Sequence, residues 1–366
     1  MFTNISNKQN QKYYMDLALQ QAKINIGNTK TNPSVGCIIT LKNSVISVGC
    51  TSRNGRPHAE VNAIKKSNIN LKNSELYVTL EPCSHYGITP PCTKAIIKSG
   101  IKKVFFAVKD PDLRSFNKAL NLLRKSGIKV NTKLLNKKIF NFYKSYYKFK
   151  SKDLPYVTSK IAVSKDFYTI NKKKKWITNI YSRGRVHLIR SSHDCLLTSS
   201  KTVIKDNPKL NCRLNGLQDT SPARIILDKE LKLLPNLKVL KDAKKYLTII
   251  FYNKENKKKI NSFKKMGIKT KKIPLINNEL NLEKALYEAK ALGFSRILLE
   301  CGLKLNAVFL KKKLIDEFKL FISSKDLKKD GEASFSKYSK LFLSKKASNN
   351  EKINLFGDKL ISYKLK

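Results

Sequence analysis

A histidine and two cysteines, far apart along the chain but alike in metal chemistry, most constrain how this protein can fold. His58 stands two residues before Glu60, and Cys83 and Cys92 are separated by a stiff loop that ends in two prolines. Three ligands of the His/Cys/Cys type are the number expected for a catalytic zinc ion, because such an ion keeps one position open for water. The fold must therefore bring these three side chains to one point.

Glu60 suggests what such an ion would do. It is near enough to His58 to reach a water on the metal without binding the metal, so it can carry a proton from the attacking oxygen to a departing amine. A His-x-Glu followed by Pro-Cys is typical of zinc deaminases. The alternative is that His58, Cys83 and Cys92 are ordinary buried residues without a metal. This is less favoured, because the chain has only four histidines and one of them falls inside the His-x-Glu.

The apolar pattern predicts alternating strands and helices throughout the chain, in layered α/β domains. In the first half, strands are predicted at 34–41, 75–80 and 103–108, with helices at 58–66 and from Cys92. After Pro155 the pattern restarts, with a helix at 282–292 and strands at 156–163, 195–198, 224–227, 247–251, 296–299, 314–322 and 360–365.

A chain of 366 residues is long enough for two domains. We expect a first domain at residues 1–146 and a second at 147–366. The connecting segment, 136–155, interleaves aromatic and basic residues, which can bind single-stranded nucleic acid by stacking. Its spacing favours instead a helix that packs one face against a domain. The lysine-rich stretch 257–272 is expected to be solvated surface.

Four segments of the first half, taken together, resemble the deaminase half of the bifunctional riboflavin-biosynthesis deaminase-reductase family, RibD: 32–37, 58–61, 79–85 and 89–92. The long loop between the cysteines separates this family from cytidine and tRNA adenosine deaminases. The resemblance implies a cytidine-deaminase-like α/β/α layered domain in which His58, Cys83 and Cys92 bind zinc and Glu60 is the proton shuttle. Its implied reaction is hydrolytic deamination, by a zinc-activated hydroxide, of 2,5-diamino-6-(5-phosphoribosylamino)pyrimidin-4(3H)-one.

The second half resembles the reductase half of the same family, in the same order, at 176–178, 185–190, 202–213 and 300–302. This implies a dihydrofolate-reductase-like α/β domain that uses NADPH to reduce the ribosyl group to a ribityl chain. No Gly-x-Gly-x-x-Gly occurs, so the common dinucleotide fingerprint is absent. The resemblance places Ala162, Trp176, Thr202 and Asp206 at the NADPH site, and Arg190, Leu210, Arg213 and Glu300 at the substrate.

From the residues alone, the guanidinium groups of Arg190 and Arg213 suit a phosphorylated substrate. Several positions depart from the family pattern. The loop 167–175 is shorter and ends in four lysines, of which Lys174 replaces an expected serine, and Ile88 replaces a frequent arginine. Two alternatives therefore stay open: a chain that retains only the deaminase, and an RNA-directed zinc deaminase with a basic binding domain. The second would predict a short Cys-x-x-Cys, and here eight residues intervene.

The charge balance bears on partners and compartment. With 75 Lys and Arg against 26 Asp and Glu, the net charge is +49, which ordinarily suggests a nucleic-acid partner. The lysines are scattered through every segment, as base-composition drift would produce, so we expect a small phosphorylated pyrimidine as partner, no nucleic acid, and a homo-oligomer. Seven cysteines without a paired framework fit the cytoplasm, and no apolar run reaches the roughly 20 residues of a membrane helix.

Overall fold

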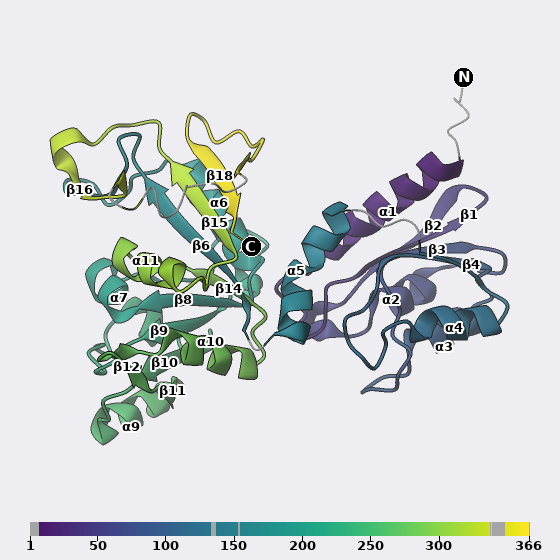
Figure 1. The fold of residues 1–366 in the computed structure, drawn as a ribbon, viewed down its shortest axis with the longest axis horizontal. Coiled ribbons are helices and arrows are strands. Elements are labelled where there is room, and N and C mark those ends of the chain that lie inside the picture. Colours follow the sequence, from purple (N-terminus) through teal and green to yellow (C-terminus); the bar gives the residue numbers. More distant parts are fainter. Residues whose placement is uncertain (1–6, 133–136, 153, 337, 339–347, 366) are drawn as a thin grey trace. The chain divides into compact units, whose positions relative to one another are not determined.

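A computed structural model describes residues 7–132, 137–152, 154–336, 338 and 348–365. The chain divides into two compact units, Met1–Asp153 and Leu154–Lys366, each a mixture of helices and strands (Figure 1). The expectation of two α/β domains is confirmed. The division follows helix α5 (Lys137–Ser151), whereas the expected boundary at residue 146 falls within that helix.

The first unit is a five-stranded sheet with helices on both faces. Its strands are ordered β2-β1-β3-β4-β5; β1 is antiparallel to β2 and β3, and β3, β4 and β5 are parallel. The elements are α1 (Asn7–Lys23), β1 (Gly36–Leu41), β2 (Ser44–Cys50), α2 (Ala59–Lys66), β3 (Glu75–Leu80), α3 (Cys92–Lys98), β4 (Lys103–Val108), α4 (Lys118–Lys125), β5 (Lys129–Asn131) and α5.

Two glycines let helices approach opposite faces of this sheet. A Cβ on Gly36 would lie 1.9 Å from the carbonyl oxygen of Ala18 in α1, and one on Gly49 would lie 2.2 Å from that of Ala59 in α2. Gly49 pairs with Cys37, the neighbour of Gly36, so the two glycines face opposite sides. Helices α1 and α5 cover one face, and α2, α3 and α4 cover the other (Figure 1).

The second unit is built on a nine-stranded sheet of order β11-β10-β9-β8-β14-β6-β15-β18-β17, parallel from β11 to β15. Its strands are β6 (Tyr156–Val163), β7 (Tyr168–Asn171), β8 (Cys195–Ser199), β9 (Ala223–Leu227), β10 (Thr248–Tyr252), β11 (Lys269–Lys272), β12 (Leu275–Ile276), β13 (Glu279–Leu280), β14 (Arg296–Leu299), β15 (Glu317–Ile322), β16 (Gly331–Ser334), β17 (Ser348–Asn350) and β18 (Lys359–Lys364). Its helices are α6 (Ile180–Ser191), α7 (Ser200–Asp206), α8 (Lys238–Lys241), α9 (Lys257–Lys265), α10 (Leu282–Ala291) and α11 (Leu303–Lys311).

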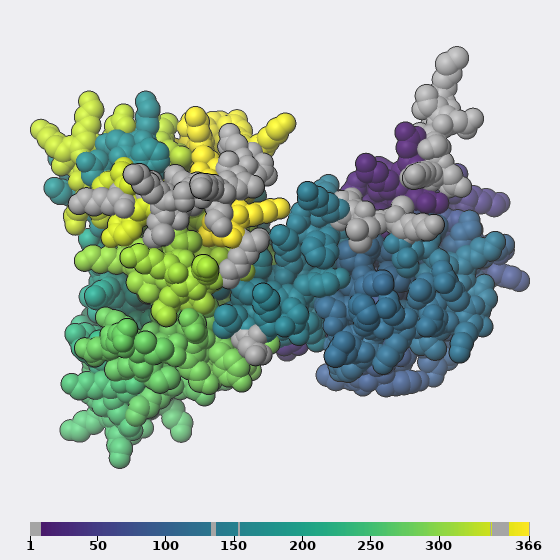
Figure 2. Space-filling model, viewed as in Figure 1, coloured from purple at the N-terminus to yellow at the C-terminus, as the bar shows by residue number. Residues whose placement is uncertain are grey.

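Successive residues of the central strands enter two separate cores, as the pleat requires. In β8, Leu197 packs with helices α10 and α11, and Leu196 packs with α7, α8 and α9 on the other face. The two sheet edges lie at opposite ends of this unit, with α9 and β11 at one end and the yellow C-terminal segment at the other (Figure 2). Because β8, β14 and β6 are parallel neighbours, the segments that follow them emerge at one edge.

Four predicted strands, β3, β4, β6 and β14, have the predicted bounds. The basic stretch 257–272 lies at the surface with nearly all its lysines exposed, as expected. It forms α9 and β11, whose Phe263 and Ile268 are buried beneath those lysines. None of the helices in the described ranges is both long and apolar enough to cross a membrane.

Candidate active sites

The three predicted ligands of the first unit come from the ends of neighbouring elements. His58 directly precedes α2, Cys83 follows the strand β3, and Cys92 is the first residue of α3. Since α2 and α3 pack against each other on the same face of the sheet, their first turns meet beside the end of β3. Local pairing keeps the loop between the cysteines folded back, because the amide N–H of Cys92 donates to Cys83 Sγ at 3.2 Å.

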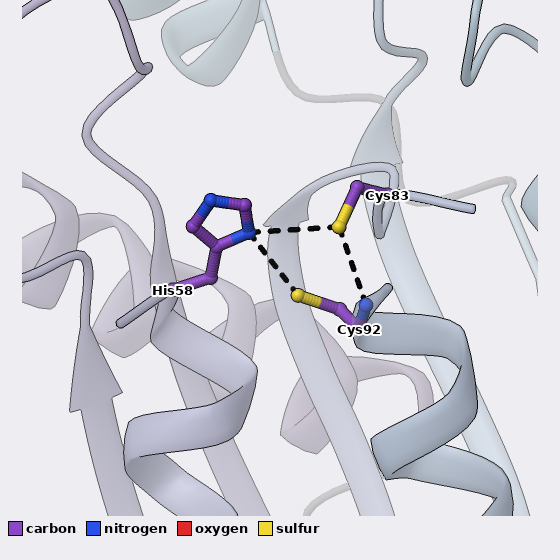
Figure 3. A group of neighbouring side chains, drawn as sticks. All are labelled: His58, Cys83 and Cys92. Atoms are coloured by element: carbon purple, nitrogen blue, oxygen red, sulfur yellow. Dashed lines mark hydrogen bonds between the residues drawn. The ribbon is translucent and has the colours of Figure 1, made fainter. Parts of the chain in front are cut away.

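The ligand atoms of these residues converge on one point (Figure 3). His58 Nδ1 lies 3.2 Å from Cys92 Sγ and 3.5 Å from Cys83 Sγ, and all three atoms lie within 4.8 Å of one another. An imidazole and two sulfurs are preferred zinc ligands, and three of them leave a position for water. The donor set therefore fits a catalytic zinc ion.

Burial and hydrogen bonding shape the protonation of this cluster. The hydrogen bond with Cys92 lowers the pKa of Cys83 to about 4, and the same bond, together with burial, raises the pKa of Cys92 well above its ordinary value. Glu60 is 3% exposed, and burial raises its pKa to about 7, against the opposing charge of His58. The carboxyl group thus lies against the ligands without belonging to the metal-binding set, and it can both accept and donate a proton near neutral pH.

Residues that the sequence analysis did not single out hold this site in shape. Asn62 donates to the carbonyl of Cys50 at 2.7 Å and to Ser52 Oγ at 2.9 Å, which ties α2 to the segment before His58. Across the sheet, Tyr143 OH lies 2.6 Å from Thr79 Oγ1 in β3. Both contacts join residues far apart in sequence, so no local motif could have revealed them.

In the second unit, a buried carboxylate joins residues from three elements. Glu300 follows β14, and its carboxylate accepts from Arg190 Nε at 2.7 Å and Nη2 at 2.9 Å, and pairs with Lys160 Nζ at 3.1 Å. Arg190 lies in α6 and Lys160 in β6. Burial alone would raise the pKa of Glu300, but the two cations hold it well below the ordinary range. We call Lys160, Arg190 and Glu300 the ion triad.

Asn211 links the ion triad to further polar groups. Its carbonyl oxygen accepts from Arg190 Nη1 at 3.2 Å, and its side-chain oxygen accepts from Arg213 Nη1 at 2.7 Å. His187 Nδ1 lies 3.1 Å from the same carbonyl oxygen. Burial, with the charges of Arg190 and Arg213, lowers the pKa of His187 to about 4, so the imidazole is neutral at pH 7. Neighbouring Leu210 is buried and has a positive φ of 53°.

The structure also places the residues expected at the cofactor. Ala162 lies in β6, as does Lys160, and Thr202 lies in the first turn of α7, with Oγ1 3.1 Å from Ser199 Oγ. Asp206 ends α7; partial desolvation raises its pKa against the charges of Lys205, Lys175 and Lys160. Lys160 therefore acts electrostatically on both Asp206 and Glu300.

Trp176 is 53% exposed, and its ring has Arg183 5.0 Å and Lys175 5.4 Å from the centroid. The lysine run before it belongs to the loop that departs from the family pattern. Lys173 pairs with Asp330 at 3.0 Å, which attaches this loop to the segment before β16. The tryptophan thus presents a flat apolar surface flanked by cations, which suits an anionic ligand with an aromatic ring.

Comparison with known proteins matches the two units to different family models. Residues 8–108 match the cytidine and deoxycytidylate deaminase zinc-binding region, and residues 155–349 match the RibD C-terminal domain. The first range contains the candidate metal site, and the second contains the ion triad.

Curated relatives align across both units. The riboflavin biosynthesis protein RibD of Aquifex aeolicus is 36% identical over 86% of this chain and 87% of its own length, and that of Escherichia coli K12 is 30% identical over 87% and 89%. Among solved structures, Acinetobacter baumannii RibD, form 1, superposes with a TM-score of 0.83 at 28% identity, over 97% of this chain and 99% of that chain. A diaminohydroxyphosphoribosylaminopyrimidine deaminase/5-amino-6-(5-phosphoribosylamino)uracil reductase of Thermotoga maritima gives 0.83 at 28%, over 98% and 99%.

Proposed function

The chain belongs to the RibD family of riboflavin-biosynthesis proteins, and from this premise we propose which of its residues carry out the two reactions. It is a bifunctional enzyme, a zinc-dependent deaminase joined to an NADPH-dependent reductase. Its first unit has the cytidine-deaminase-like architecture and its second the dihydrofolate-reductase-like one. We assign the deaminase to residues 1–153 and the reductase to residues 154–366, in place of the expected 1–146 and 147–366, so that α5 stays whole.

For the deaminase, His58, Cys83 and Cys92 would hold the zinc ion, and the observation that carries this assignment is the convergence of their ligand atoms within 4.8 Å. Zinc bound there would acidify a water molecule and so supply a nucleophile at neutral pH. Glu60 takes the proton from the attacking oxygen and delivers it to the leaving amine. Its burial keeps solvent from competing for that proton, and its separation from the ligand set leaves its oxygens available.

For the reductase, NADPH would supply a hydride to the ring-opened ribose of the deaminated product. We assign Ala162, Trp176, Thr202 and Asp206 to the cofactor, and Arg190, Leu210, Arg213 and Glu300 to the substrate. The ion triad supports this division, because Glu300 orients Arg190 through two hydrogen bonds while Arg213 forms none of the ion pairs among the described residues. Arg213 therefore keeps its charge for an anionic ligand.

The substrate class is a small pyrimidine. We propose that the deaminase substrate is 2,5-diamino-6-(5-phosphoribosylamino)pyrimidin-4(3H)-one, whose phosphate suits a chain with a net charge of +49. The scattered lysines and the long loop between Cys83 and Cys92 favour this substrate over nucleic acid. We also infer that the enzyme is cytoplasmic and that it forms a homo-oligomer. Sedimentation of the purified chain tests the oligomeric state.

One sample tests both halves. The purified protein is analysed for zinc and given the pyrimidine substrate with and without NADPH. We expect about one zinc ion per site, ammonia release that does not need NADPH, and NADPH oxidation that follows it. Ammonia release without NADPH oxidation would favour the single-activity alternative, and loss of both would overturn the assignment.

A further inference from the structure

Two nitrogen atoms of the half-buried Arg56 side chain lack a hydrogen-bond partner among the described residues. Its Nε and Nη1 atoms are shielded from solvent and have no hydrogen-bond partner among the described residues, and none of the ion pairs found there includes it. A buried donor without an acceptor destabilises the folded protein, and a charged donor does so more strongly. A ligand that accepts hydrogen bonds from Arg56 would remove this destabilisation.

Arg56 lies at the rim of the candidate metal site. Arg56 stands two residues before His58, and a Cβ on Gly87, in the loop between the cysteines, would lie 3.5 Å from Arg56 Nη2. The guanidinium therefore lies beside the loop that joins Cys83 to Cys92.

The stretch that follows Cys83 holds a second buried polar group without a partner among the described residues. This group is the hydroxyl of Ser84. One group stands two residues before the ligand His58, and the other directly follows the ligand Cys83. A cationic fork and a hydroxyl together suit an anion with several oxygens, such as a phosphate.

The remaining acid of the site does not supply this acceptor. Glu60 lies against the metal ligands and shows no hydrogen bond to Arg56. The reacting amine of a pyrimidine must face the metal and Glu60, so its phosphorylated substituent must extend away from them. The loop that contains Gly87 is exposed there, which leaves room for that substituent.

We propose that Arg56 binds the phosphate group of the pyrimidine substrate at the deaminase site. This inference rests on the proposed function and deepens it, because it names the residue by which the site distinguishes a phosphorylated substrate from its phosphate-free counterpart. Arg56 touches the substrate but takes no part in proton transfer, so its effect falls on binding.

The test compares two substrates in Arg56→Gln. Ammonia release from the phosphorylated pyrimidine should lose about 10- to 100-fold in kcat/KM, mostly through KM, as expected for one charge-assisted hydrogen-bond donor. Release from the phosphate-free riboside should change less than about twofold, with zinc content retained. Arg56→Lys should lie between the wild type and Arg56→Gln for the phosphorylated substrate. Equal losses on both substrates, or no loss on the phosphorylated one, would overturn the proposal.

A matched control is available on the same loop. Arg53 is exposed in the 3-10 turn Arg53–Gly55, and Arg53→Gln makes the same change in charge. Arg53→Gln should leave kcat/KM for ammonia release unchanged with both substrates. A loss of kcat/KM equal to that in Arg56→Gln would show that any nearby positive charge has the same effect, and would overturn the proposal. Should Arg56→Gln lose zinc, Arg56→Lys decides by the same two-substrate comparison.

Phosphate binding gives a readout that does not depend on turnover. Inorganic phosphate, titrated into the zinc-loaded full chain and followed by ³¹P NMR, should bind more weakly in Arg56→Gln than in Arg53→Gln. If the wild-type protein releases no ammonia but its phosphate binding depends on Arg56, the proposed reaction is wrong and the anion site is supported. If it releases ammonia but phosphate binding is unchanged in Arg56→Gln, the reaction is supported and the anion site is wrong.

Discussion

The candidate metal site and the ion triad differ in how far along the chain their residues are spread. His58, Cys83 and Cys92 lie at the ends of three successive elements, α2, β3 and α3, of which α2 and α3 pack against each other. Lys160 lies in β6 and Glu300 directly follows β14, and these two strands pair although about 130 residues of chain separate them. A site of contiguous elements can be predicted from spacing, whereas a site of distant ones exists only once the sheet has formed.

The two sites also differ in what completes them. In the metal site, sulfur and imidazole ligands gather at one point, and two nitrogens of nearby Arg56 have no hydrogen-bond partner among the described residues. In the ion triad, Glu300 is matched by two cations within the protein. The first site therefore depends on what binds it, and the second contributes to the stability of its own unit.

Loss of a ligand should have the largest effect. Cys83→Ser removes a thiolate that the zinc ion requires, so bound zinc and ammonia release should both fall to background while NADPH oxidation on the deaminated substrate continues. Metal analysis and the two assays measure this. Cys50→Ser, a free cysteine of the same unit outside the ligand set, is the control and should keep its zinc. Undiminished zinc in Cys83→Ser would contradict the ligand assignment.

Loss of the proton shuttle should come next. Glu60→Gln keeps the size of the side chain and removes its ability to accept a proton, so ammonia release should fall about 10²- to 10⁴-fold. Zinc content and reductase activity should be unchanged, since Glu60 is outside the ligand set. Rapid turnover by this variant would show that another group moves the proton.

Opening the ion triad should destabilise only the second unit. Glu300→Gln leaves Arg190 and Lys160 without their shared counter-charge in a buried position, which costs about 3–5 kcal/mol of unfolding free energy. Urea unfolding followed by the fluorescence of Trp176, the only tryptophan, reports on that unit. Glu283→Gln breaks an exposed pair with Lys312 and should cost about 1 kcal/mol or less. Similar losses of unfolding free energy in Glu300→Gln and Glu283→Gln would show that the ion triad stabilises the unit no more than an exposed ion pair does.

The smallest effect should be a change in pH dependence. The pKa of His187 is about 4 in the folded protein, below the ordinary value of about 6.5. As pH falls from about 6.5 to 4, His187 therefore becomes protonated in the unfolded chain but stays neutral in the folded protein. The unfolding free energy decreases over this range. His187→Asn should make this decrease shallower in Trp176-monitored unfolding. His85→Asn, in the first unit, should follow the wild type; identical slopes for all three would refute the shift.

The bounds of strands made of continuous apolar runs could be predicted to the residue, as those of β3 and β4 were. A strand that is buried on both faces is apolar along its whole length, so the run begins and ends with the strand. Charged segments could not be predicted in this way. The lysines of 257–272 concealed α9 and β11, whose burial depends on Phe263 and Ile268 meeting a core supplied by other strands. Asn211 and Asn62 escaped notice for a related reason, since each acts through partners that are distant in sequence or carried by the backbone.

The sequence by itself determined the ligand chemistry, the acid beside it and the family, because residue types and short spacings are properties of the chain before it folds. The tertiary structure alone decided that Glu300 would be held by Lys160 and Arg190, and that Arg56 Nε and Nη1 would be shielded from solvent without a partner among the described residues. The physical reason is that desolvation and charge pairing depend on which distant segments surround a group, and only packing brings those segments together.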